Sequence, residues 1–161
     1  VPLPIPEPAK WWNLWAKTKN VFVRAQPRKW TIEENYIMYF PWLDCKVCVP
    51  KGFVFDGASV PRVLWPFMSP TGIMFIAGLF HDLGYRYNCW FDENHNQIYC
   101  GHGQAFFDDQ IERMGTYIND ARTTPNICWA GLRLFGWAAW NKRRKEGHDA
   151  SVDFPPKDGI E

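Results

Sequence analysis

SPTGIMFIAGLFHDLGY, at residues 69–85, is an apolar run that closes on a His-Asp pair. Ser69 followed by Pro70 is a typical helix start, with the serine as N-cap and the proline at the first helical position. Because the run is apolar on almost every side, we predict a helix buried at the centre of the fold. Burial of His81 or Asp82 without a hydrogen-bond partner would cost free energy, so we expect other parts of the chain to supply such partners.

Helical spacing separates the two members of this pair. His81 and Tyr85 lie one turn apart on the same face, whereas Asp82 is rotated away from them by about 100°. Farther along the chain, Gln104 and Asp108 belong to one stripe of a second predicted helix. If the two helices pack antiparallel, the side chains of that stripe reach His81.

Two hypotheses account for this polar cluster. In the first, an oriented histidine activates water beside an oxygen-ligated ion, calcium or zinc. In the second, the same groups are buried structural links that lock the two helices to each other and to the preceding loop. The catalytic hypothesis assigns roles to His81, Asp82, Tyr85, Gln104 and Asp108, with Asp82 and Asp56 as metal ligands.

The remaining segments predict an α+β fold. β-branched and aromatic residues between turn residues indicate a small N-terminal antiparallel meander, with strands at residues 21–23, 29–32, 36–40 and 44–49. The meander packs on a C-terminal half of three helices, at residues 70–85, 103–119 and 124–145. Thr124 is the expected N-cap of the last helix. A β-hairpin is expected between the first two helices, at residues 89–100.

The two ends of the chain differ in composition from its middle. Residues 1–10 alternate proline with other residues, which favours an extended arm that docks on its own domain or on another subunit. Residues 146–161 are polar and contain a proline pair, so we expect an extended tail. Between them, residues 11–145 are predicted to form a single globular domain.

Five cysteines raise the question of metal binding and disulfides. Cys45 and Cys48 have ligand-like spacing, and a zinc site built on them would draw further ligands from Cys89, Cys100, His95 and His102. Residues three apart on a strand point to opposite faces, which argues against that site. Cys89 and Cys100 lie opposite each other in the predicted hairpin, either disulfide-bonded or packed as small apolar groups.

The composition limits the partners. A net charge of +1 over 161 residues produces no global field that attracts nucleic acid. The aromatic content of 17%, with ten Trp, favours protein interfaces. The most apolar stretch, residues 127–140, is interrupted by Arg133 and is shorter than the roughly 20 residues of a membrane span. No secretory signal is visible, so we expect synthesis in a cytoplasm.

One block of the sequence, VPKGFVFDGASVPR at residues 49–62, is followed by an HDxxY element at residues 81–85. This combination resembles a family of unknown function that is common in tailed bacteriophages and prophages, whose members continue with a helix marked ADxxF. The resemblance covers roughly residues 36–140. It implies that the Pro-rich arm, the hairpin and the polar tail are particular to this chain.

A second likeness is local. HDLGYR at residues 81–86 resembles the helix of bacterial secreted phospholipases of the A-two type, in which the histidine activates water and the next aspartate binds calcium. In those enzymes an aspartate of a DxxF element orients the histidine. Aligned on Phe107, this chain has Gln104 at that position, and a neutral amide cannot stabilise an imidazolium as a carboxylate does. Asp108, one turn farther on, is the available substitute.

Together these patterns predict first a virion-associated structural protein of a phage tail, neck or baseplate, made in the host cytoplasm. Its partners would be other virion proteins, bound through the N-terminal arm and the aromatic surface within an oligomeric assembly. The alternative is a metal-assisted hydrolase of lipid or cell envelope that uses His81.

Overall fold

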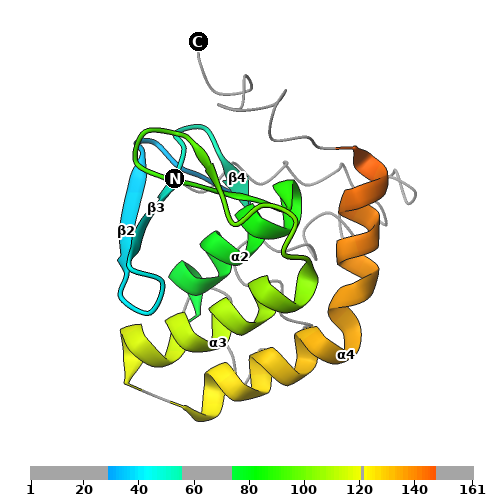
Figure 1. Cartoon of the computed structure of the whole chain (residues 1–161). Coiled ribbons are helices and arrows are strands. Elements are labelled where there is room, and N and C mark those ends of the chain that lie inside the picture. The colour runs from blue at the N-terminus through cyan, green and yellow to red at the C-terminus, as the bar shows by residue number, and fades with distance from the viewer. Residues whose placement is uncertain (1–28, 56–73, 121, 148–161) are drawn as a thin grey trace, which may run out of the picture.

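A computed structural model of the chain describes residues 29–55, 74–120 and 122–147. Four short strands precede the first described helix, two more form a hairpin after it, and two further helices follow. Figure 1 shows the first helix between the strands on one side and the other two helices on the other. The predicted α+β class is confirmed.

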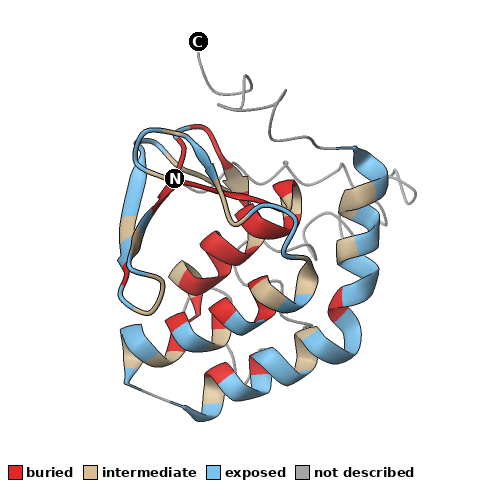
Figure 2. Ribbon diagram, in the orientation of Figure 1, coloured by how far each residue is buried: buried red, intermediate tan, exposed pale blue. Residues whose placement is uncertain are grey.

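Helix α2, Phe75–Tyr87, is the buried helix that the apolar run predicts. Its buried side chains, red in Figure 2, include Ala77, Leu79, Phe80, Leu83 and Tyr85. The helix ends at Asn88, which has a left-handed φ of 52° and donates its backbone N–H to the carbonyl oxygen of Gly84. The expected start at Ser69 and Pro70 lies outside the described residues.

Helices α3 (Gln104–Asn119) and α4 (Thr123–Glu146) match their predicted ranges to within one residue at each end. The N-cap of α4 is Arg122 rather than Thr124, and the helix ends at Gly147 with a left-handed φ of 70°. Figure 1 shows that α4 bends near its middle. None of the described helices is both long enough and apolar enough to cross a membrane.

Arg144 fastens the second half of α4 to the end of α2. Its Nη2 donates to the carbonyl oxygens of Tyr85 and Arg86, over 2.5 Å and 2.6 Å. These carbonyls belong to the last turn of α2, where no backbone N–H of the same helix is available to them. The guanidinium also lies over the Trp140 ring, 4.7 Å from its centre. A cation at a helix C-terminus is further favoured by the helix dipole.

Two glycines let the helices approach closely. A Cβ atom on Gly84 of α2 would lie 2.2 Å from the ring of Phe107 on α3. A Cβ atom on Gly115 of α3 would lie 2.7 Å from Met74 Sδ and 2.9 Å from Pro125 Cγ of α4. Each glycine therefore marks a helix crossing where no other side chain fits.

The strands pair as one antiparallel pair nested inside another. The inner pair is β2 (Tyr36–Phe40) with β3 (Cys45–Val49), and the outer pair is β1 (Trp30–Thr31) with β4 (Val54–Phe55). The predicted meander would have paired consecutive strands, so the pairing of the first strand with the fourth is a correction. The predicted strand at residues 21–23 lies outside the described residues.

The turn after β3 explains this pairing. Gly52 has a φ of 82°, a conformation that glycine adopts easily, and reverses the chain. Its N–H donates to the carbonyl oxygen of Ile32 over 2.8 Å, and the N–H of Ile32 donates to Phe53 over 3.0 Å. The returning chain is thereby hydrogen-bonded to the residue that directly follows β1 and is brought alongside that strand.

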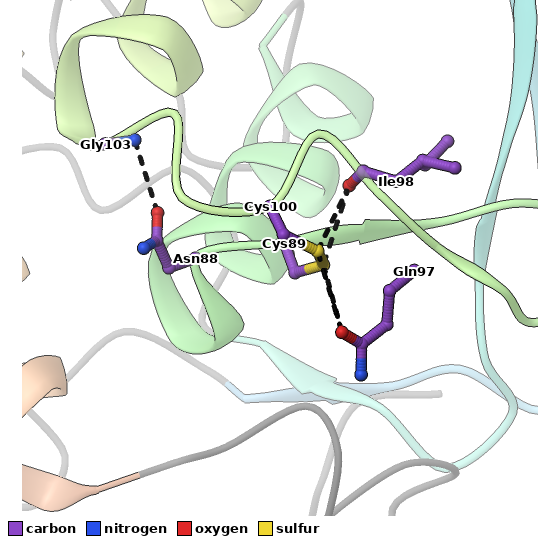
Figure 3. Close-up of a disulfide and its surroundings, with 6 residues drawn as sticks. All are labelled: Asn88, Cys89, Gln97, Ile98, Cys100 and Gly103. Carbon is purple, nitrogen blue, oxygen red and sulfur yellow. Dashed lines mark hydrogen bonds between the residues drawn. A yellow bond between two sulfur atoms is a disulfide. The ribbon is translucent and has the colours of Figure 1, made fainter.

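The hairpin between α2 and α3 is confirmed, with β5 (Trp90–Phe91) antiparallel to β6 (Gln97–Ile98). Of the two alternatives for its cysteines, the structure contains the disulfide between Cys89 and Cys100. Figure 3 shows this bridge next to the Gln97 side chain and the Ile98 carbonyl. The disulfide joins the two ends of the hairpin, close to where α2 ends and α3 begins.

Asn88 links the two helices at the same place. Its carbonyl oxygen accepts a hydrogen bond from the N–H of Gly101, and its Oδ1 accepts one from the N–H of Gly103, the latter drawn in Figure 3. These bonds and the disulfide hold the start of α3 against the end of α2. The hairpin therefore helps to set how the two helices face each other.

Aromatic rings from strands, hairpin and helices form the core between them. Phe40 of β2 contacts both Phe80 of α2 and Trp90 of β5, with ring centres 5.1 Å and 5.0 Å apart. Trp90 also meets Phe107 of α3 at 5.6 Å and donates its indole N–H to the carbonyl oxygen of Phe80 over 2.9 Å. The buried indole thus has a partner for its polar atom.

The close helix crossing predicts a steric effect at Gly84. Gly84→Ala places a methyl group where the Phe107 ring lies, so we expect the free energy of unfolding to fall by about 1–3 kcal/mol in urea denaturation. Gly131→Ala on α4 is the matched control, because nothing lies within 4 Å of its added Cβ. That variant should be neutral or more stable by up to about 1 kcal/mol, since alanine favours helix. Equal stability of the two variants would contradict the crossing geometry.

Candidate functional site

The crossing of α2 and α3 brings the predicted polar residues together. Because Gly84 lets Phe107 approach α2, the next residue of α3, Asp108, lies against the face that carries His81 and Tyr85. His81 and Tyr85 are one helical turn apart, and their ring centres are separated by 4.0 Å. The site is therefore made by two helices that a short hairpin holds in place.

Asp108 is the centre of the site and has no exposed surface. Its Oδ1 accepts a hydrogen bond from Tyr85 Oη over 2.6 Å and lies 3.1 Å from His81 Nε2. Its Oδ2 accepts a hydrogen bond from Gln104 Nε2 over 3.1 Å and lies 3.6 Å from Arg133 Nη1. A buried carboxylate needs such partners, because leaving it unpaired costs several kcal/mol.

These contacts determine which nitrogen of the His81 ring carries the proton. An ionised carboxylate only accepts hydrogen bonds, so His81 Nε2 is the donor in its contact with Asp108. In a neutral ring the lone pair is then on Nδ1. Among the described residues, none forms a hydrogen bond with Nδ1. A histidine whose one nitrogen is bound to a carboxylate and whose other nitrogen carries the lone pair is the arrangement of a general base.

Tyr85 acts as a permanent hydrogen-bond donor. Burial raises the pKa of its hydroxyl well above the ordinary value, and the hydrogen bond to the Asp108 carboxylate raises this pKa further. The ring also meets Trp140 edge to face, with ring centres 5.1 Å apart. Tyr85 therefore stays protonated over the range in which proteins function and orients Asp108.

Helix α4 completes the site through the Leu132 carbonyl and Gly136. The Gln104 amide donates both to Asp108 and, over 3.3 Å, to the carbonyl oxygen of Leu132. A Cβ atom on Gly136 would lie 2.7 Å from Tyr85 Oη and 3.0 Å from Gln104 Nε2. Asp108 Oδ2 and the Leu132 carbonyl oxygen both accept hydrogen bonds at this position. An amide can donate to them, whereas a carboxylate has no donor.

The orienting carboxylate is therefore present, at a position different from the one that the phospholipase-like alignment indicates. That alignment assigns the role to position 104, whereas the structure assigns the contact with His81 to Asp108. Gln104 lies one turn earlier on the same face of α3 and supports Asp108. The concern that an amide has replaced the carboxylate is removed by this geometry.

The proposed metal ligands stay a prediction. Asp82 is half-buried on α2 and, as expected, is rotated by about 100° from His81. Asp56 lies outside the described residues. Among the residues that are described, no three His, Cys, Asp or Glu side chains gather as a metal-binding group. For the zinc alternative, Cys89 and Cys100 are disulfide-bonded and so are not available as thiolate ligands.

Sequence reasoning missed the contribution of α4. Arg133 is the only charged residue in the apolar stretch at residues 127–140. That isolated charge was the one sequence signal that α4 contributes to a buried polar site. Gly136 and the Leu132 carbonyl carried no signal of their own. Their roles depend on the way α4 packs against α2 and α3.

Comparison with known proteins identifies one family. A family model described as "Protein of unknown function (DUF1353)" matches residues 30–131. No curated protein and no solved structure matches the chain significantly. The matched range includes His81, Tyr85, Gln104 and Asp108, and it ends before Arg133.

The raised pKa of Tyr85 predicts an alkaline loss of stability. The unfolded chain releases this proton near pH 10 and the folded protein retains it, so stability falls as the pH rises above about 10. The expected slope is up to about 1.4 kcal/mol per pH unit in urea denaturation. Tyr85→Phe should remove this contribution and should cost about 1.5–3 kcal/mol at neutral pH, through the lost bond to Asp108.

The control is Tyr117→Phe, because the Tyr117 ring is largely exposed on α3. It should leave both the neutral stability and the alkaline slope unchanged. If wild type and Tyr85→Phe have parallel stability curves between neutral and alkaline pH, the buried bond from Tyr85 to Asp108 does not operate in solution.

Proposed function

The chain belongs to the DUF1353 family of proteins of unknown function, so its activity has to be argued from its own site, and we propose that it is a hydrolase in which His81 activates water. The single observation that carries the proposal is the contact of His81 Nε2 with the buried Asp108 carboxylate at 3.1 Å. The proposed substrates are esters or amides of lipid or of the cell envelope.

In the proposed reaction, His81 Nδ1 takes a proton from water while the water oxygen attacks the substrate carbonyl. The proton is then passed from the imidazolium to the leaving group, so the ring returns to its starting state. Asp108 holds the ring in the required tautomer and stabilises the imidazolium. Tyr85 and Gln104 bind the two oxygens of Asp108 and keep this carboxylate in place.

The sequence adds a candidate for the electrophilic part of the site. Asp82 and Asp56 are the carboxylates that we propose as ligands of calcium or zinc. Oxygen ligands are the usual choice of calcium, and such an ion would polarise the substrate carbonyl. The roles of His81 and Asp108 do not depend on which ion is bound.

Hydrolysis assays on purified protein test the proposal. With calcium or zinc added, we expect release of fatty acid from phospholipid vesicles or of soluble fragments from peptidoglycan. His81→Ala should abolish the activity. Asp108→Asn keeps the shape of the side chain and removes its charge, so kcat should fall by about 10²–10⁴. The control is His102→Ala, because His102 is exposed and lies outside the network.

Circular dichroism and the unfolding midpoint identify variants that lose activity by unfolding. The proposal is rejected if folded His81→Ala retains wild-type activity. It is also rejected if the wild-type protein hydrolyses neither substrate with either ion, in which case the cluster is a structural link between helices.

We also propose a second candidate function, a virion-associated interaction protein. Strand β2 favours it, because Tyr36, Ile37 and Tyr39 are exposed there. Among the described residues β2 pairs only with β3, so within this part of the chain its other edge could accept an added strand from a partner. The N-terminal arm, the other proposed contact, lies outside the described residues.

Mass spectrometry of purified phage particles tests this second function. We expect the protein at a constant ratio to the tail or neck proteins, and we expect Ile37→Lys to lower that ratio, because it introduces charge at the proposed contact. A well-behaved monomer that is absent from purified particles would rule out the virion role.

A further inference from the structure

Helix α4 is apolar on two faces, and among the described residues only one of them packs against the other elements. The inner face contributes Cys128, Leu132, Gly136 and Trp140 to the core and the site. The outer face exposes Leu134, Phe135 and Trp137, with 66%, 70% and 59% of their surface accessible. Figure 2 shows the second half of α4 as mostly exposed. Three large neighbouring apolar side chains in contact with water are a marker of a binding surface.

The charges of α4 are mostly positive. From Thr123 to Glu146 the helix carries five cationic residues and one acidic residue, Glu146, whose carboxylate lies 3.8 Å from Lys142 Nζ and 3.1 Å from Arg143 Nη1. Lys142 and Lys145 are exposed and, at about 100° per residue, fall within the same outer arc as Leu134 and Phe135. The outer face thus combines large apolar side chains with positive charge at its C-terminal end.

A hollow lies along the same face. It has a volume of about 610 Å³, and the described residues in its lining are Trp137, Ala138, Asn141, Lys142, Arg144 and Lys145. Its lining combines an indole ring with cationic groups. That combination suits a ligand with an apolar part and an anionic head.

From these observations we propose that the outer face of α4 binds the surface of a membrane that contains anionic lipids. Leu134, Phe135 and Trp137 would enter the boundary between head groups and acyl chains, and Lys142 and Lys145 would contact anionic head groups. An amphipathic helix with Trp, Phe and Leu on one face and Lys or Arg beside them is the usual form of such contacts. The helix lies on the surface and does not span the bilayer.

The shape of the apolar arc favours lipid over a partner helix. From Trp137 through Leu134 to Phe135 the arc covers about 160° of the helix circumference. A seam between two helices is narrower, because only two positions in seven face the partner. A lipid surface is fluid, so it can cover a wide apolar arc of a helix without pockets that match each side chain. Nucleic acid would use the cations and leave these large apolar groups in water.

This proposal is independent of the hydrolase mechanism. It rests on residues beyond the range that the family model matches, which ends at residue 131. The same helix supplies Arg133 and Gly136 to the site from its inner side. Membrane binding can therefore be measured whether or not the protein hydrolyses any substrate.

Vesicle flotation of the full-length protein tests the proposal. We expect the protein to float with vesicles of phosphatidylcholine mixed with phosphatidylglycerol, and to float less with phosphatidylcholine alone or at high salt. The double variant Leu134→Ser, Trp137→Ser should bind at least about tenfold more weakly, because two large apolar side chains are lost from the contact. Lys142→Gln with Lys145→Gln should remove the preference for phosphatidylglycerol.

The matched control is Tyr117→Ser on α3, since Tyr117 and Trp137 are both 59% exposed. It should bind vesicles like the wild type. The proposal is overturned if the protein does not float with the mixed vesicles, or if Tyr117→Ser weakens binding as much as the double variant does. It is also overturned if light scattering shows a dimer that Leu134→Ser, Trp137→Ser dissociates while vesicles are not bound, which would assign the face to a second copy.

Discussion

A buried carboxylate with partners on three helices is the interaction on which this structure depends. Asp108 receives hydrogen bonds from α2 through Tyr85 and His81, from its own helix through Gln104, and an ion pair from α4 through Arg133. Burial of an unpaired carboxylate is among the most costly events in folding, so the three helices are stable together only in the arrangement that brings these groups to it. The same arrangement determines the chemistry that His81 can perform.

The small residues of the helices make that convergence possible. Gly84 admits the ring of Phe107 and so brings Asp108 close to α2, and Gly136 leaves the space that Tyr85 and Gln104 occupy. The disulfide of Cys89 and Cys100 supports the crossing from outside. Whether the site is catalytic or structural, a side chain at position 84 would displace the Phe107 ring, and one at position 136 would displace the polar ends of Tyr85 and Gln104.

Helix α4 has two functions in this architecture. Its inner face closes the Asp108 site and is fastened to the end of α2 by Arg144. Its outer face leaves large apolar side chains and cations in water, which motivates the proposed membrane contact. If both proposals hold, one helix would connect a surface that binds lipid to a site that hydrolyses a bond.

Much of the fold followed from local pattern. The α+β class, the range of α3, the range of α4 and the hairpin were all predicted, because periodicity and turn residues are properties of neighbouring positions. The stripe of Gln104 and Asp108 was also predicted to reach His81 if the two helices pack antiparallel. Sequence could not decide which of these two orients the histidine, since residues four apart share a face and only the depth of the helix crossing distinguishes them. The pairing of β1 with β4 and the contribution of Gly136 likewise depended on contacts between distant segments, which only the tertiary structure brings together.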